Sequence, residues 1–244
     1  MFKGLTEGLF SQILDLVFPK QCVNCDKYGS YLCSTCRTNR VEFYTENECH
    51  VCRFPTLLGN RYIHSGCMSN SALSRVYVCL RYNSLARAII EEVKYKHHFD
   101  YVSLINGLIM HTVDLQIFKN SILIPVPLHN SKKRSRGFNQ AELIANRLVL
   151  TVRKLGIDTS MIDLIERRKN TKTQVGMTRL ERLHNLDDAF SIRQKFTGDI
   201  AGLKNKQILL IDDVMTTGTT LEECAKLLNT AGFDNIKALV FARS

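Results

Sequence analysis

Apolar residues recur along this chain in two different ways, and the change between them lies near residue 75. Beyond that point, runs with strand-like patterning alternate with runs at helical spacing. We predict strands at 76–82, 121–124, 161–165, 207–211 and 235–242, and helices at 84–96, 101–113, 139–155 and 221–231. The run at 207–211 is continuously apolar, as in a strand that is buried on both faces of a parallel sheet. This alternation predicts an α/β fold with a mostly parallel, doubly wound sheet.

The first part of the chain lacks that alternation. Leu5, Leu9 and Ile13 have helical spacing within residues 2–18, and Pro19 ends the predicted helix. We expect this amphipathic helix to dock on the rest of the protein; a membrane-surface helix is the alternative, which its few basic residues do not favour. Residues 20–68 have no long periodic run and cannot build a conventional apolar core. The predicted division is a helix at 1–19, a small module at 20–72 and an α/β domain at 73–244.

The cysteines give the small module a different source of stability. Seven of the nine fall between residues 22 and 67, mostly in Cys-x-x-Cys pairs, which in a reducing compartment are typical of metal ligands. Four two-ligand turns would hold two tetrahedral zinc ions and supply the folding energy that a core cannot. The predicted ligands are Cys22, Cys25, Cys33, Cys36, Cys49, Cys52, His64 and Cys67. The spacing leaves open whether the turns pair sequentially or interleave. We expect the other two cysteines, Cys79 and Cys224, in the core.

Charge is distributed unevenly. The formal net charge is +10, and residues 132–182 hold 13 Lys or Arg against five Asp or Glu, a local net charge of +8. Polyanions are the natural partners of such a segment. No apolar run approaches the ~20 residues that cross a bilayer, and the N-terminus lacks the pattern of a secretory leader. We therefore expect a cytoplasmic protein, with a peripheral position at the inner face of the membrane as the alternative.

The basic side chains fall into two groups. Lys132, Lys133, Arg134 and Arg136 follow the Pro125-Val126-Pro127 turn, while Arg168, Arg179 and Arg182 lie in a loop-like stretch at 167–187. A closing loop that neutralises pyrophosphate is one interpretation of that stretch. A nucleic-acid surface is another, in which aromatic residues such as Phe138 stack on bases. A solvated charged face is the third.

The most specific segment is Ile208-Leu-Leu-Ile-Asp-Asp-Val-Met-Thr-Thr-Gly-Thr-Thr-Leu221. A buried strand leads into two carboxylates, a loop of small residues follows, and a helix begins at once. Loop amides and the positive end of the helix would face one point, which suits a phosphate. Thr220 and Glu223 have capping-box spacing, so we expect the helix to start there. Asp212 and Asp213 would accept hydrogen bonds from sugar hydroxyls.

This segment resembles the phosphoribosyl-pyrophosphate (PRPP) motif of type I phosphoribosyltransferases, and nearly the whole chain resembles the ComF (ComFC) family of competence proteins. The similarity extends over the cysteine-rich start, residues 82–94, 125–128, 136–140, Thr173-Gln174, Arg182, Asn185 and the final motif. It implies a Rossmann-like, mostly parallel sheet with a small N-terminal double zinc ribbon, in which the metal-binding turns pair sequentially.

The same resemblance implies a set of ligand contacts. Asp212 and Asp213 would hold the ribose of PRPP, the loop would hold its phosphate, and Mg²⁺ would bridge its pyrophosphate near the turn after Ile124. The implied PRPP contacts are Asp212, Asp213, Val214, Met215, Thr216, Thr217, Gly218, Thr219, Thr220, Pro125, Val126 and Pro127. Met215 stands at a position where the family often has an aromatic residue.

Two functions of different classes follow. The first, implied by the resemblance and favoured by the charge, is a competence protein that handles single-stranded DNA during natural transformation, together with other competence proteins. The second is an active phosphoribosyltransferase, whose acceptor the sequence does not name. A weaker third hypothesis is a structural adaptor that PRPP regulates.

Overall fold

The structure is a computed structural model that describes residues 19–45, 48–56, 63–128, 130–167, 189–193 and 200–244. The predicted N-terminal helix lies outside the described residues, as do Arg168, Arg179 and Arg182 and most of the loop predicted at 167–187. Among the described residues, no helix combines the length and the apolar character needed to cross a membrane.

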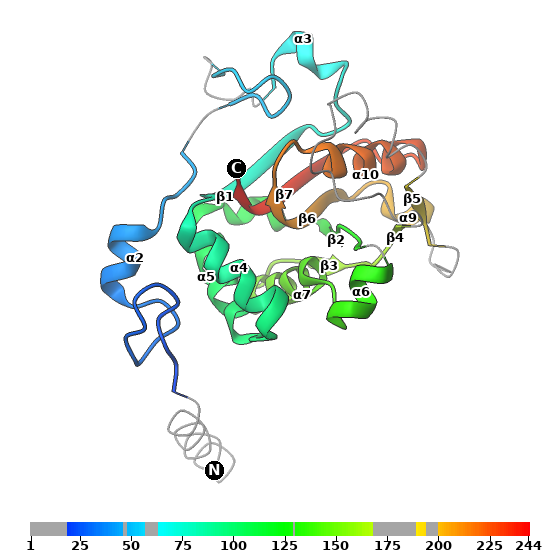
Figure 1. The fold of residues 1–244 in the computed structure, drawn as a ribbon. Coiled ribbons are helices and arrows are strands. Elements are labelled where there is room, and N and C mark those ends of the chain that lie inside the picture. The colour runs from blue at the N-terminus through cyan, green and yellow to red at the C-terminus, as the bar shows by residue number, and fades with distance from the viewer. Residues whose placement is uncertain (1–18, 46–47, 57–62, 129, 168–188, 194–199) are drawn as a thin grey trace.

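Five parallel strands form the central sheet, in the order β1-β7-β6-β2-β3 (Figure 1). They are β1 (Arg75–Arg81), β2 (Ser121–Pro125), β3 (Thr159–Met161), β6 (Gln207–Met215) and β7 (Ile236–Arg243). The central strand β6 pairs with β2 on one side and with β7 on the other, and Leu209 lies opposite Leu123 and Lys237. The predicted mostly parallel α/β sheet is confirmed.

Helices cover both faces of this sheet. One face carries α4 (Ser84–Lys96), α5 (Asp100–Thr112) and α7 (Gln140–Lys154), and the other carries α10 (Thr219–Thr230) (Figure 1). Successive residues of β6 serve the two cores: Leu209 and Ile211 pack with the three helices, and Ile208 and Leu210 pack with α10. The continuous apolar run is explained by burial on both sides.

One predicted strand was wrong. Residues 161–165 do not form a single strand, because β3 ends at Met161 and a separate strand, β4 (Ile165–Arg167), begins beyond it. β4 pairs antiparallel with β5 (Phe190–Ile192) in a second, small sheet. The break is invisible to apolar patterning because Ile162 and Leu164 continue the run through it. Short helical segments were also not predicted: η1 (Leu115–Phe118), α6 (Asn130–Arg136) and α9 (Ile200–Leu203).

The cysteine-rich segment contacts the α/β domain at several points. Its first half carries α2 (Ser34–Arg40) and lies against α5, where Tyr31 Oη donates to Asp100 Oδ2 at 2.7 Å. Phe43 then pairs with Leu80 on β1, which covers that exposed sheet edge. The second half carries α3 (Ser65–Met68) and lies at the opposite side of the domain (Figure 1).

Candidate functional sites

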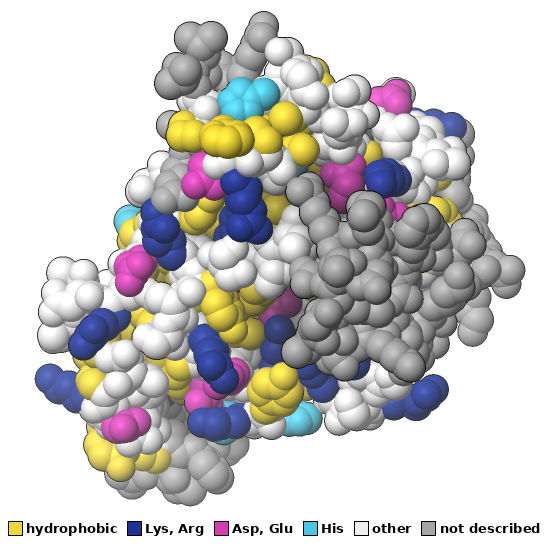
Figure 2. All heavy atoms as spheres, turned by 45° about the horizontal axis from the view of Figure 1, so that its top comes forward, with side chains coloured by type: hydrophobic (Ala, Val, Ile, Leu, Met, Phe, Trp, Pro, Cys, Tyr) yellow, Lys and Arg dark blue, Asp and Glu magenta, His cyan; other side chains and the backbone are white. Residues whose placement is uncertain are grey.

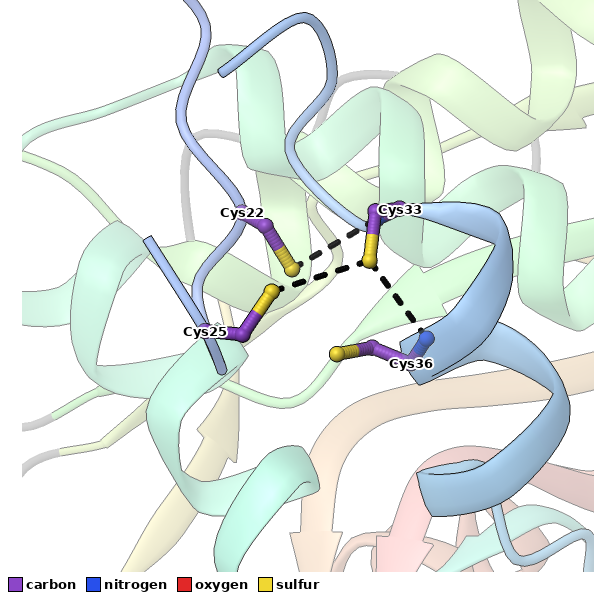
Figure 3. Close-up of side chains that lie close together, drawn as sticks. All are labelled: Cys22, Cys25, Cys33 and Cys36. Carbon is purple, nitrogen blue, oxygen red and sulfur yellow. Dashed lines mark hydrogen bonds between the residues drawn. The ribbon is translucent and has the colours of Figure 1, made fainter. Parts of the chain in front are cut away.

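Four thiols converge in the first half of the cysteine-rich segment. The sulfur atoms of Cys22, Cys25, Cys33 and Cys36 all lie within 4.8 Å of one another (Figure 3). Cys33 caps α2, since its sulfur accepts the Cys36 amide at 3.4 Å. Burial opposes ionisation of Cys22, but the amides of Cys33, Asn24 and Cys25 outweigh it and lower the pKa of the thiol to about 6. The cluster fits zinc, which binds thiolates tetrahedrally.

A second four-ligand cluster contains Cys49, Cys52, His64 and Cys67, again within 4.8 Å. His64 directs Nδ1 at Cys52 Sγ, 3.2 Å away, and its Nε2 lies 3.1 Å from the carbonyl oxygen of Pro55. A proton on Nε2 would donate to that carbonyl and leave Nδ1 free to bind metal, the usual arrangement of a ligand histidine. The two clusters confirm sequential pairing of the metal-binding turns and support zinc sites.

The loop after β6 is shaped by one glycine. Gly218 has φ +81°, a left-handed backbone conformation that favours glycine over any residue with a Cβ atom. Gly218 is also the N-cap of α10, which begins at Thr219 without a side-chain cap. The predicted capping box at Thr220 and Glu223 was wrong, because the left-handed glycine starts the helix earlier.

This loop and the end of β6 enclose an open hollow of about 310 Å³. Within it, the hydroxyl groups of Thr217 and Thr219 share a hydrogen bond, with their oxygen atoms 2.7 Å apart. The lining residues are Asp212, Val214, Met215, Thr216, Thr217, Gly218, Thr219, Thr220 and Leu221. The first turn of a 12-residue helix and its flanking amides meet here, as in an anion site. The loop residues that the resemblance implies as PRPP contacts, Thr216 to Thr220, therefore all line this hollow.

The other implied PRPP contacts lie elsewhere. Pro125, Val126 and Pro127 are buried, and Val126 exchanges hydrogen bonds with β6 and α7 rather than lining the hollow: its amide donates to Ile211 and its carbonyl accepts from Asn139. They connect β2 to the basic helix α6.

The two aspartates have different surroundings. Asp213 is buried, pairs with Lys94 of α4, and accepts a hydrogen bond from Gln140 of α7 at 3.3 Å. Burial raises its pKa, but the Lys94 ammonium outweighs this and holds the pKa of Asp213 below its ordinary value. Burial and the neighbouring Asp213 charge hold the pKa of Asp212 well above its ordinary value. The pair thus carries one charge more readily than two.

Basic side chains of α4, α6 and β4 interact electrostatically with one another: burial, and then repulsion from Arg167, Arg136 and Lys94, lowers the pKa of Lys132. Two of them are linked to the aspartates directly, since Lys94 pairs with Asp213 and Arg136 contacts Gln140, which binds the same carboxylate. We call Lys94, Lys132, Arg136 and Arg167 the cationic cluster. Arg136 also donates to Gln140 Oε1 at 3.2 Å, and Gln140 in turn donates to Asp213.

The structure separates the basic residues that the sequence grouped together. Lys132 and Arg136 join the cationic cluster, whereas Lys133 faces Glu142 at 3.7 Å and Arg134 is exposed on α6. Lys94 and Gln140 were missed as site residues, whereas Arg167 belongs to the basic stretch at 167–187 that was expected to neutralise pyrophosphate. Lys94 looked like an ordinary polar position of an amphipathic helix, and only packing brings it to Asp213.

A further missed residue comes from the cysteine-rich segment. Arg53, next to the ligand Cys52, donates from its guanidinium to the carbonyl oxygen of Thr216 at 2.8 Å. Nearby, Glu222 in the first turn of α10 accepts from Ser71 Oγ at 2.8 Å and from the Ala72 amide at 2.5 Å. The second metal cluster is therefore tied directly to the phosphate-type loop.

Comparisons with known proteins agree with this two-part organisation. The family model described as "Double zinc ribbon domain" matches residues 13–68, and the model described as "Phosphoribosyl transferase domain" matches residues 134–244.

Three curated relatives have names that refer to competence or DNA. The chain is 37% identical over 126 residues to Competence protein F of Haemophilus influenzae, covering 50% of each chain. It is 32% identical over 130 residues to Competence protein ComFC of Streptococcus pneumoniae, covering 53% of this chain and 51% of that one. It is 27% identical over 163 residues to DNA utilization protein YhgH of Escherichia coli O157:H7, covering 64% and 66%. The chain spans about half the length of the first two relatives.

Proposed function

Since the chain belongs to the ComF family, with a double zinc ribbon before a phosphoribosyltransferase-like domain, we propose that it handles single-stranded DNA during natural transformation and binds PRPP. The observation that carries the proposal is the phosphate-type hollow at the end of the parallel strand β6, where Asp212 lines the hollow and the adjacent Asp213 pairs with Lys94. Open α/β sheets bind ligands at that edge. The site of action would be the cytoplasm, including the inner face of the membrane, beside other competence proteins.

The proposed PRPP contacts follow the chemistry of its three parts. The amides and hydroxyls of 216–220 would hold the phosphate at the start of α10. Asp212, which lines the hollow, would accept from the ribose hydroxyls, and Asp213 would do so once Lys94 moves toward the pyrophosphate. Lys132, Arg136 and Arg167 would neutralise the pyrophosphate together with Mg²⁺. The Mg²⁺ ion would supply charge neutralisation, and the aspartate oxygens are the kind of ligand it prefers.

Single-stranded DNA presents the same anionic chemistry as pyrophosphate. The cationic cluster and the exposed Arg134 on α6 would contact successive backbone phosphates without reading their sequence. PRPP and DNA would therefore use overlapping parts of one surface.

Calorimetry on the full-length, zinc-loaded protein tests the proposal. PRPP with Mg²⁺ should bind, and ribose phosphate, which lacks the pyrophosphate, should bind more weakly because it does not engage the cationic cluster. Fluorescence anisotropy with a labelled single strand should show binding that decreases with salt. Absence of binding heat with PRPP would refute the PRPP part of the proposal, and salt-insensitive or absent DNA binding would refute the DNA part.

An active phosphoribosyltransferase is the second candidate. It is favoured by the position of Asp212 in the lining of the phosphate-type hollow, next to the buried Asp213, where a ribose with a departing pyrophosphate would lie. Pyrophosphate release measured with a panel of free bases separates the candidates. Turnover with one base would establish the enzyme, and PRPP binding without release in the presence of any base would favour the DNA-handling protein.

A further inference from the structure

The turn between α4 and α5 presents aromatic rings to solvent. The side chains of Tyr95 and Phe99 are 64% and 50% exposed. The ring of Phe99 meets that of Phe138 edge-on with centroids 5.0 Å apart, and the His97 ring lies 5.4 Å from Phe138. We call Tyr95, His97, Phe99 and Phe138 the aromatic platform.

This turn is fixed in place by a buried carboxylate. Glu92 pairs with Lys96 Nζ at 2.6 Å and with His98 Nδ1 at 2.8 Å. The backbone supports the same geometry, because His97 adopts a left-handed C-cap conformation and its amide donates to the Glu92 carbonyl. The exposed rings are thus presented by an ordered turn and not by a frayed helix end.

The platform adjoins the cationic cluster. The Arg136 guanidinium lies 5.1 Å above the Tyr95 ring, and its Nη2 is 3.4 Å from Tyr95 Oη. Lys94, the residue before Tyr95, pairs with Asp213 at the phosphoribosyl-type site. On the face drawn in Figure 2, basic side chains lie beside hydrophobic and histidine side chains. The contact between Arg136 and Tyr95 therefore joins the aromatic platform to the cations of α6.

The combination of exposed rings and cations favours a nucleic-acid partner over a neutral apolar one. A single exposed ring is common on protein surfaces and needs no explanation. Several grouped rings next to cations have the composition of surfaces that bind single-stranded nucleic acid, where rings stack on unpaired bases and cations hold phosphates. A neutral apolar partner would not account for Arg136 against the Tyr95 ring or for Lys94 next to Tyr95 in the chain, whereas a polyanion with flat bases accounts for both rings and cations.

We propose that the aromatic platform stacks unpaired bases of single-stranded DNA while the adjoining cationic cluster holds its phosphates. The inference rests on the proposed DNA handling and adds the residues that recognise bases. Stacking tolerates any base, so the platform would strengthen binding without imposing a sequence.

Anisotropy with two labelled strands of equal length tests the platform: an oligothymidine strand and a strand of abasic nucleotides. The wild-type protein should bind oligothymidine more tightly. Phe99→Ala and Tyr95→Ala should each weaken oligothymidine binding about 10-fold. They should leave the salt dependence unchanged, since neither side chain neutralises a phosphate. Tyr28→Ala is the matched control, because Tyr28 is 67% exposed on the first half of the cysteine-rich segment.

Several outcomes would overturn the platform. One is equal affinity of the wild type for both strands while binding stays salt-dependent; the proposed DNA handling would then survive without base stacking. Another is unchanged oligothymidine affinity in Phe99→Ala, with thermal unfolding showing a folded variant. Tyr95→Phe should keep its affinity, and a loss there would point to the hydroxyl contact with Arg136 and against stacking. If neither strand binds the wild type, the proposed DNA handling fails too.

Discussion

At the residue scale, the two adjacent aspartates have opposite effects on stability. Asp213 is buried and its ion pair with Lys94 lowers its pKa, so its charge stabilises the folded state at any pH above the ordinary aspartate pKa. Asp212 has a raised pKa, so the folded chain holds its proton more tightly than the unfolded chain does. Ionising Asp212 therefore costs stability as the pH rises above its unfolded value of about 3.9. The Asp212 carboxylate therefore lowers the stability of the folded protein, and a role in ligand binding would explain its presence.

Asp213→Asn and Asp212→Asn should change the stability of the folded protein in opposite directions. Asp213→Asn leaves Lys94 without its buried partner and should lower the free energy of unfolding by roughly 3 kcal/mol at neutral pH. Asp212→Asn should raise the unfolding temperature at neutral pH, and the gain should shrink as the pH falls and vanish below about pH 3, where the carboxyl is mostly protonated in both states. Thermal unfolding across pH checks both expectations.

The same variants separate stability from binding. Each loses a charge-assisted hydrogen bond to the ligand, a change of roughly 1.5–3 kcal/mol, so PRPP affinity with Mg²⁺ should decrease at least 10-fold in both. Calorimetry that finds wild-type affinity in the double variant would refute the assigned roles of Asp212 and Asp213.

At the scale of elements, the cysteine-rich segment contains two metal clusters with different neighbours. The first lies against α5 through Tyr31 and Asp100, and the second is tied to the phosphate-type loop by Arg53. Loss of one metal should therefore have local consequences rather than unfold the sheet, whose two cores contain mostly residues of the α/β domain.

Zinc content should be two ions per chain, and Cys22→Ser should reduce it to one while the α/β domain stays folded. Metal analysis and circular dichroism check this. Cys79→Ser is the control: Cys79 is fully buried outside both clusters, and burial raises its pKa to about 12, so its thiol is neutral. That variant should keep two zinc ions and lose stability instead. One ion or none in the wild type would contradict the two-site assignment.

Arg53→Ala should weaken PRPP binding about 5-fold, because the loop carbonyl of Thr216 loses a hydrogen bond worth about 1 kcal/mol. Arg37→Ala is the control, since Arg37 is exposed on α2 in the first half of the segment. Calorimetry of both variants with full zinc content makes the comparison. Equal affinities would show that the ribbon does not influence the loop.

At the scale of the whole molecule, residues 132–182 carry a local net charge of +8, most of the formal +10 of the chain. Replacing Lys132, Lys133, Arg134 and Arg136 by Ala should weaken single-stranded DNA binding for every sequence. It should also flatten the log–log salt dependence by about 0.7 for each phosphate that the variant no longer neutralises.

PRPP should compete with DNA for binding to the wild-type protein. Competition should weaken in the Lys132→Ala, Arg136→Ala pair and persist in the Lys133→Ala, Arg134→Ala pair, because only the first two join the cationic cluster.

Titrations of DNA binding at several salt concentrations, with and without PRPP and Mg²⁺, measure these effects. Salt-insensitive binding, or binding that is unchanged in the fourfold variant, would show that the basic segment is a solvated charged surface with no role in DNA binding. The phosphoribosyltransferase hypothesis would then gain support.

The sequence by itself determined the features that depend on local chemistry. Cys-x-x-Cys turns need only short-range geometry to present two ligands, and a continuous apolar run needs burial on both faces wherever it lies. The loop at 216–220 is likewise recognisable because Gly218 and its small neighbours leave the amides accessible. Only the tertiary structure decided which distant residues meet these features. Lys94, Gln140 and Arg53 come from three separate segments, and no periodic pattern marks them. Their roles arise when folding buries Asp213 beside Lys94 and Gln140 and brings Arg53 to the exposed carbonyl of Thr216.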